Sequence, residues 1–322
     1  MTTTSTTERA LFARVPRLGD LVPFVPLADG LPTPVEQLEE RLWVQRDDLT
    51  DSRYGGNKVR KLEHLLAIAA RRGGAVLTAG ATGSHHVVAT AVHAGRLGLP
   101  VEAVRFPQPP TDHVAEMAAR ADALGVRSTL APTSTAMPFV LARRWAALAP
   151  QGATLVTPGG STPVGVLGYV GAGLELVDQF AAAGWKEPDD VVVALGSGGS
   201  SVGLALGMAL GGWRRATVVA VRVADRIVTN GPVLRALEGG VRALLALGGC
   251  VPPAARWSID GHWFGPGYGH PTPAGTAAAA RGAEAGLASE PTYTAKALAA
   301  AFERLDRGRR VVFVQTLAAE PG

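Results

Sequence analysis

Two lysines three positions apart, Lys58 and Lys61, are the side chains of this sequence best suited to covalent chemistry. The chain holds only four lysines against twenty-seven arginines. An ε-amine can lose its proton and attack a carbonyl carbon, whereas a guanidinium cannot. Gly55 and Gly56 would let the backbone approach a ligand closely. Helical spacing predicts that both amines lie on one face, with Asn57 capping the helix, although a solvated helix start explains the same pattern.

The segment 196–200, Gly-Ser-Gly-Gly-Ser, is a candidate anion site. It lies between a Val-rich run and a helical pattern, so its backbone N–H groups would face a ligand at the start of a helix, where the helix dipole favours a phosphate. The segment lacks the Lys-Ser/Thr ending of a nucleoside-triphosphate loop, and its spacing differs from the dinucleotide fingerprint. Neither ATP nor NAD is therefore favoured, and a plain turn is the alternative.

Histidine and tyrosine supply the remaining candidates for acid–base chemistry. His85 and His86 are adjacent, so on a helix their side chains would diverge by about 100° and could not easily bind one metal ion. Tyr268 stands between glycines in Gly-Pro-Gly-Tyr-Gly, and Tyr293 precedes a helical run. Each could be a packed aromatic residue with a satisfied hydroxyl group. We consider Tyr268 the stronger ligand contact, because its glycine neighbours offer little packing.

Parallel sheets covered with helices are expected to position these candidates. Val-rich runs of strand length alternate with helical segments, which is typical of strands buried on both faces. The expected strands are 42–45, 75–78, 101–104, 191–195, 217–223 and 311–314. Segments 57–72 and 84–97 are expected to be helices, the second capped by Ser84. The uncharged stretch 191–212 is long enough for a membrane span, but the Gly/Ser turn divides it, which favours strand, turn and helix.

Composition limits the class of protein. The formal charge of +4 comes from arginines scattered along the chain, so we expect no nucleic-acid partner. Cys250 is the one cysteine, which excludes an intrachain disulfide and a cysteine-based metal cluster. The first seven residues show no apolar run after a basic start, so no secretion signal is indicated. We therefore expect a cytoplasmic protein without a metal ion and without membrane attachment.

Five segments, taken in order, resemble the pyridoxal-phosphate enzymes of the 1-aminocyclopropane-1-carboxylate deaminase and D-cysteine desulfhydrase family, which has the tryptophan-synthase-β-like fold. The resemblance extends from about residue 47 to residue 316. Each segment is weakly specific alone, but five in the right order are strongly specific. They are 55–63 (Gly-Gly-Asn-Lys-Val-Arg-Lys-Leu-Glu), 158–165 (Pro-Gly-Gly-Ser-Thr-Pro-Val-Gly) with Gly168-Tyr169, 196–200, 265–269 and 293–297 (Tyr-Thr-Ala-Lys-Ala).

The resemblance implies an α/β fold with two open, twisted, mostly parallel sheets and helices on both faces. A large cofactor-binding domain would comprise residues 1–61 and 169–322, and a small α/β domain, residues 62–168, would be inserted in it. The cofactor would lie between the two domains, where closure can exclude water. The resemblance also implies a homodimer.

The resemblance assigns roles to individual residues. Lys58 would hold pyridoxal 5′-phosphate covalently and move protons once displaced, while Lys61 would face the phosphate. Ser84 resembles the serine beside the reacting substrate, and Tyr268 and Tyr293 resemble the two active-site tyrosines. The expected cofactor-binding residues are Asn57, Lys58, Lys61, His85, Ser197, Gly198, Gly199, Ser200 and Thr316.

Three departures from the family pattern bear on the substrate. His85 replaces the asparagine that usually contacts the cofactor ring. Thr294 stands where the deaminase branch usually has a glutamate that pairs with the pyridine nitrogen. The segment 315–318, Gln-Thr-Leu-Ala, replaces the His-Thr-Gly-Gly of the desulfhydrase branch. We therefore expect a substrate that is neither of the two family namesakes.

The expected function is that of a lyase or deaminase which removes the Cα proton of a small amino acid and eliminates a group from Cβ, in the manner of D-cysteine desulfhydrase. A racemase, a β-replacement enzyme or an enzyme that forms carbon–carbon bonds on a specialised amino acid is the first alternative, since His85 would lie near the reacting carbon. A homologue that binds the cofactor without catalysis is the second, because the altered segments 83–86 and 315–318 would explain it.

Overall fold

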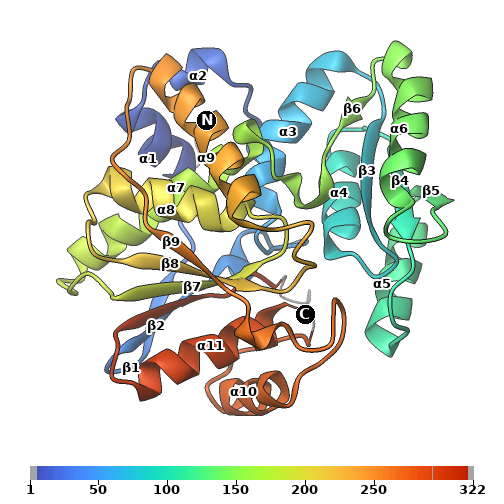
Figure 1. Cartoon of the computed structure of the whole chain (residues 1–322). Coiled ribbons are helices and arrows are strands. Elements are labelled where there is room, and N and C mark those ends of the chain that lie inside the picture. The colour runs from blue at the N-terminus through green and yellow to red at the C-terminus, as the bar shows by residue number, and fades with distance from the viewer. Residues whose placement is uncertain (1–5, 292, 318–322) are drawn as a thin grey trace.

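The computed structural model describes residues 6–291 and 293–317, which form two sheets with helices packed against both faces (Figure 1). The strands are β1 Val35–Glu39, β2 Leu42–Gln45, β3 Val76–Ala81, β4 Val101–Phe106, β5 Arg127–Leu130, β6 Thr154–Leu155, β7 Asp190–Leu195, β8 Thr217–Arg222, β9 Trp257–Asp260 and β10 Val311–Val314. The α-helices are α1 Thr6–Arg14, α2 Leu18–Leu21, α3 Val59–Arg72, α4 His85–Gly95, α5 Asp112–Ala123, α6 Met137–Leu148, α7 Pro163–Ala182, α8 Gly199–Gly211, α9 Gly231–Leu247, α10 Pro273–Glu284 and α11 Thr294–Asp306.

The larger sheet has six strands in the order β1-β2-β10-β7-β8-β9. All neighbours are parallel except the edge pair of β1 and β2. Val191 and Val193 of β7 pack under α7 and α8, while Val192 faces α11 on the other side. Because both faces are buried, β7 shows the continuous apolar run that parallel sheets require.

The smaller sheet has four parallel strands in the order β5-β4-β3-β6. One face packs against α3, α4 and α5, and the other against α6, which lies on the outer side of the molecule in Figure 1. Its strands come from residues 127–130, 101–106, 76–81 and 154–155, so they all lie between β2 and β7 in the sequence. The division into domains at residues 61/62 and 168/169 stays a prediction.

All six expected strands are present, although β3 and β4 extend further than expected, to Ala81 and Phe106. The segment 191–212 is strand, turn and helix, as expected, and no described helix is both long and apolar enough to span a membrane. Four short strands have no signal in the sequence. These are β1, β5, β6 and β9, which are edge strands or only two residues long, and β5 is largely exposed, so none carries an apolar run.

Both helix predictions need correction at their caps. Helix α3 begins at Val59 with Lys58 in the N-cap position, and no side chain caps it, so the expected cap by Asn57 is wrong. Helix α4 does begin after Ser84, but the Ser84 side chain makes no capping bond, and the helix ends at Gly95 rather than Leu97. The polar side chains at these two helix starts are therefore available to the space between the sheets.

Candidate active site

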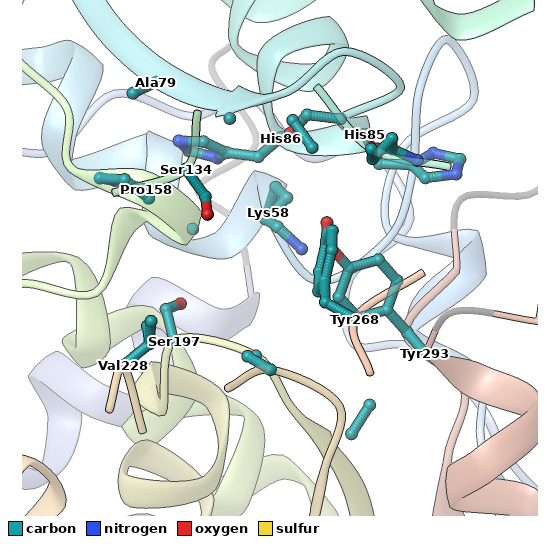
Figure 2. A pocket seen from close by; sticks show the side chains of 18 of the residues that line it. Lys58, Ala79, His85, His86, Ser134, Pro158, Ser197, Val228, Tyr268 and Tyr293 are labelled. Carbon is teal, nitrogen blue, oxygen red and sulfur yellow. The ribbon is translucent and has the colours of Figure 1, made fainter. Parts of the chain in front are cut away.

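A cavity of about 780 Å³ lies between the two sheets, at the carboxyl ends of parallel strands. The cavity is lined by residues 79–81 at the end of β3, Ala194 of β7, Ala224 after β8 and Thr316 after β10. Ligands of open α/β sheets bind at this end, because the loops and helix starts that follow the strands converge there. Figure 2 shows side chains that reach this space from segments following strands of both sheets, such as His86 after β3 and Ser197 after β7.

Lys58 enters the cavity from the start of α3. Its Nζ atom donates a hydrogen bond of 2.5 Å to Asn57 Oδ1, and Asn57 Nδ2 donates to Ser200 Oγ at 3.2 Å. Burial lowers the pKa of Lys58 to about 8, against the opposing charge of Glu290. An amine with this pKa is partly neutral near physiological pH, which is the state that attacks a carbonyl carbon.

Lys61 lies one turn further along α3, beside the first turn of α8. Its Nζ atom donates to the carbonyl oxygen of Gly159 at 3.2 Å. The N–H group of Gly199 donates to Ser161 Oγ at 3.0 Å, and Ser161 Oγ lies 2.7 Å from Ser197 Oγ. An ammonium group, two hydroxyl groups and the positive end of a 13-residue helix thus meet in a small cup.

The cup fits a phosphate group. A Cβ atom on Gly199 would lie 2.5 Å from Ser161 Oγ and 3.1 Å from Lys61 Nζ, and one on Gly159 would lie 2.1 Å from Ser197 Oγ, so only glycine leaves this space. Burial, and then the charge of Lys58, lowers the pKa of Lys61 well below its ordinary value. A bound dianion would offset the cost of this buried amine, and the donors present are those that phosphate accepts from.

Tyr268 and Tyr293 face Lys58 across the cavity, and Figure 2 shows the lysine amine pointing toward their hydroxyl groups. The two hydroxyl groups are hydrogen-bonded to each other, with ring centroids 6.0 Å apart. Burial raises the pKa of Tyr268 to about 12 and that of Tyr293 well above its ordinary value, so both remain protonated. Glu290 fixes Tyr293 at the start of α11 by accepting its N–H at 2.6 Å.

Ser84, His85 and Thr316 complete the expected set on the cavity wall. Gly80 makes room for Ser84, because a Cβ atom there would lie 2.4 Å from Ser84 Oγ. The carbonyl oxygen of Thr316 accepts the N–H of Asn57 at 3.3 Å. This hydrogen bond joins the segment after β10 to the segment that carries Lys58. The His85 ring points away from Lys58 and bonds instead to Tyr54 and His113.

The structure therefore brings the residues singled out in the sequence to one place. Those that line the cavity are Asn57, Lys58, Lys61, Ser84, His85, Ser197, Gly198, Ser200, Tyr268, Tyr293 and Thr316. Gly199 belongs to the cup, where its backbone N–H donates to Ser161 Oγ. Residue 318, the end of the altered segment 315–318, lies outside the described residues.

Four residues around the site were missed. Ser161 belongs to the Gly-Ser-Thr-Pro segment that carries the resemblance, so its hydroxyl could have been assigned to the anion site. Glu290 three residues before Tyr293 is a helix-start signal, because a carboxylate there accepts backbone N–H groups. Tyr54 and His113 carry no sequence signal, since only the packing of α5 against α4 brings His113 to the site. Among the described residues, no group of three or more His, Cys, Asp or Glu side chains could hold a metal ion.

The family model of pyridoxal-phosphate dependent enzymes matches residues 27–316 of the chain. The chain belongs to this family. Pyridoxal phosphate is therefore its cofactor, and the expected resemblance and fold are confirmed. As a pyridoxal-phosphate enzyme it is of the 1-aminocyclopropane-1-carboxylate deaminase and D-cysteine desulfhydrase type.

Individual relatives of this pyridoxal-phosphate enzyme carry different names. It is 32% identical to a D-cysteine desulfhydrase of Klebsiella pneumoniae (strain 342), over 89% of this chain and 92% of the relative. It is 37% identical to the nocardicin C-9′ epimerase of Nocardia uniformis subsp. tsuyamanensis, over 78% of this chain and 79% of the relative. The solved structure of an ACC deaminase homologue matches with a TM-score of 0.77 and 27% identity, over 95% and 94% of the two chains.

Proposed function

We propose that this enzyme removes the Cα proton of a small amino acid and eliminates a group from Cβ, with release of ammonia and a 2-oxo acid. The observation that carries the proposal is the placement of the Lys58 amine opposite the paired hydroxyl groups of Tyr268 and Tyr293. An elimination requires a base that accepts the Cα proton and a protonated acid that donates to the leaving group, and this cavity holds both. Bound pyridoxal phosphate withdraws electrons from Cα and so weakens its C–H bond.

Lys58 would hold the cofactor covalently and, once displaced by the amine of the substrate, would accept the Cα proton at Nζ. Its pKa of about 8 leaves a useful fraction of the amine unprotonated near neutral pH. Asn57 would orient this amine through the 2.5 Å hydrogen bond between them. In this proposal Lys58 is both the residue that carries the cofactor and the base that accepts the Cα proton.

The cup at the start of α8 would bind the cofactor phosphate. Lys61 would supply the positive charge, Ser161 and Ser197 hydroxyl donors, and the α8 helix start backbone N–H groups. Thr316, buried at the end of β10, would face the cofactor ring as a neutral hydroxyl partner.

The two tyrosines would donate a proton to the substrate, and the start of α4 would bind it. Tyr268 and Tyr293 keep their protons because burial raises their pKa, so one of the pair would donate a proton to the group that leaves Cβ. The N–H groups at the start of α4, with the hydroxyl of Ser84, would bind the substrate carboxylate.

The substrate is proposed to be neither 1-aminocyclopropane-1-carboxylate nor D-cysteine. Thr294 cannot supply the charge that a glutamate would bring, and its hydroxyl accepts the N–H of Glu290 at 2.9 Å within the cap of α11. The His85 side chain and Leu317, which follows Thr316, also differ from the family pattern on the same cavity wall.

Epimerisation at Cα is the second candidate. It is favoured by the relative that is 37% identical and is named an epimerase, and by His85, which gives this wall an imidazole in place of an amide. A β-replacement or a carbon–carbon bond formation would use the same removal of the Cα proton. Family membership makes an enzyme the better hypothesis than a binding protein without catalysis.

The two reactions leave different products. The purified enzyme with its cofactor is incubated with a panel of D- and L-amino acids, and ammonia, 2-oxo acid and the enantiomer ratio are measured. Elimination predicts ammonia and 2-oxo acid in equal amounts, whereas epimerisation predicts the opposite enantiomer and no ammonia. Lys58→Ala is the control without the base. If no amino acid loses its Cα hydrogen, the proposal is wrong.

We also propose that the enzyme is a cytoplasmic homodimer with a small inserted domain of residues 62–168. The single cysteine supports the compartment, and the resemblance of the sequence to the family supports the dimer and the inserted domain. Light scattering should give about twice the chain mass of 33.2 kDa. The mass of a monomer would contradict the dimer.

A further inference from the structure

Three hydrogen-bonded side chains connect the wall of the active-site cavity to solvent. Tyr54 Oη lies 2.6 Å from His85 Nδ1, and His85 Nε2 lies 2.8 Å from His113 Nε2. Tyr54 and His85 line the cavity that also holds Lys58. His113, on α5, has a side chain that is 38% exposed, so the far end of this connection reaches water.

Every group in this connection can both donate and accept a proton. A neutral imidazole carries one N–H group and one bare nitrogen, and a phenol has one O–H group with free lone pairs. In one arrangement the Tyr54 hydroxyl donates to His85 Nδ1, His85 Nε2–H donates to His113 Nε2, and His113 Nδ1–H faces outward. In the other, both hydrogen bonds reverse and His113 Nδ1 carries no proton. Both arrangements use the same two pairs of facing atoms, so neither requires a ring to turn over.

The surroundings keep the inner part of the connection neutral. Burial, and then the nearby charges of His113, Lys58 and Arg120, lower the pKa of His85 to about 3. Burial also raises the pKa of Tyr54, whose ring lies under the Arg120 guanidinium at 4.8 Å, while Met117 Sδ lies 3.8 Å from its hydroxyl. His85 therefore stays neutral, and it can accept a proton at one ring nitrogen only while it gives up the proton at the other.

The outer end has a different environment. Nδ1 of His113 lies 3.9 Å from Glu116 Oε2, and both side chains are partly exposed. A second cavity of about 80 Å³ is bordered by His85 and His113 on one side and by Tyr268, Tyr293 and Glu290 on the other. This volume exceeds the space that one water molecule needs several times over, so water can join the tyrosine pair to the histidine pair.

We propose that Tyr54, His85 and His113 form a proton path that exchanges protons between the active-site cavity and solvent. As a proton from the cavity binds Tyr54 Oη, the original hydroxyl proton moves to His85 Nδ1. The Nε2 proton of His85 moves to Nε2 of His113, and the Nδ1 proton of His113 moves to water. One proton enters and one leaves, and no side chain keeps a charge. The path rests on the proposed function, because it serves a reaction that releases and takes up the Cα proton.

The path predicts a change in hydrogen exchange rather than in substrate binding. In a panel of D- and L-amino acids that carry deuterium at Cα, the wild-type enzyme should release deuterium into water from at least one member. His113→Asn should slow this release by about a hundredfold, at the low end of what a positioned proton-transfer group contributes, and should leave KM unchanged. Imidazole added to His113→Ala should restore the release. His262→Asn, an exposed histidine on the 3-10 turn after β9, is the matched control and should behave as wild type.

Nitrogen NMR of the histidine rings, without substrate, gives a readout that does not depend on turnover. His113→Asn should shift both ring nitrogens of His85, because the variant removes its partner at Nε2. Unshifted His85 signals, or wild-type deuterium release in His113→Asn and in His85→Asn, would overturn the path. Absence of deuterium release in the wild type, with the expected NMR shift, would instead overturn the proposed function.

Discussion

Lys58 donates a hydrogen bond of 2.5 Å to the side-chain oxygen of Asn57, and Asn57 passes the connection on to Ser200 in the first turn of α8. The start of α3, which carries both lysines, is thereby joined to the helix start that forms the proposed phosphate site. Lys58 faces the two tyrosines, whereas Lys61 donates to Gly159 at the cup. The geometry gives the two neighbouring lysines different surroundings, so we expect them to have different roles.

Lys61→Ala should weaken cofactor binding about ten- to hundredfold, because one charge-assisted hydrogen bond to a phosphate contributes about 1.5–3 kcal/mol. Lys61→Arg keeps the charge and should weaken binding less. The dissociation constant is measured by titrating each variant with pyridoxal phosphate. If Lys61→Ala binds pyridoxal phosphate as tightly as the wild type does, Lys61 does not bind the phosphate.

Gly159→Ala should lower cofactor affinity as well as stability. Gly159 has φ of 68°, and a Cβ atom there would lie 2.1 Å from Ser197 Oγ, inside the cup. Gly184→Ala is the matched control, because Gly184 has φ of 67° and a Cβ atom there would meet nothing within 4 Å. The control should lose only the backbone cost of about 1–2 kcal/mol and keep wild-type affinity. The cup assignment fails if both variants bind the cofactor equally well.

Arg60→Met should lower the free energy of unfolding by about 3–5 kcal/mol, because it leaves two buried carboxylates without their cation. The Arg60 guanidinium lies 3.0 Å from Asp47 Oδ1 and 2.9 Å from Glu175 Oε2, and all three side chains are almost fully buried. Arg14→Met breaks an exposed pair with Asp178 and should cost less than about 1 kcal/mol. Urea denaturation measures both, and similar losses would contradict the prediction.

His64→Gln should make the fold less sensitive to acid. Burial lowers the pKa of His64 from 6.5 to about 4. Above pH 6.5 the folded and unfolded chains bind the same number of protons here, but between 6.5 and 4 the unfolded chain binds more, so acid favours unfolding. At about 1.4 kcal/mol per pH unit, the wild type should lose about 2 kcal/mol more than the variant between pH 7 and pH 5. Identical losses, measured by urea denaturation, would be inconsistent with this account.

The buried strands and the Gly/Ser turn could be predicted from the sequence because each depends on local composition. Val191–Leu195 is apolar because both faces of β7 are covered, and a Cβ atom on Gly199 would lie 2.5 Å from Ser161 Oγ. The edge strand β5 could not be predicted, since its side chains are largely exposed and its pairing depends on β4 alone. The bond between His85 and His113 was likewise invisible, because it joins two helices through tertiary packing. The resemblance, rather than spacing, singled out Lys58 over Lys61.

Covalent attachment of the cofactor at Lys58 is the central claim, and the chain offers only four lysines as sites. The purified enzyme with its cofactor is treated with borohydride, which makes the link permanent, and its peptides are mapped by mass spectrometry. The account predicts the pyridoxyl phosphate mass on Lys58 alone, and its loss together with the visible absorbance in Lys58→Arg. Attachment at Lys61, Lys186 or Lys296 in the wild type, or no attachment, would contradict it.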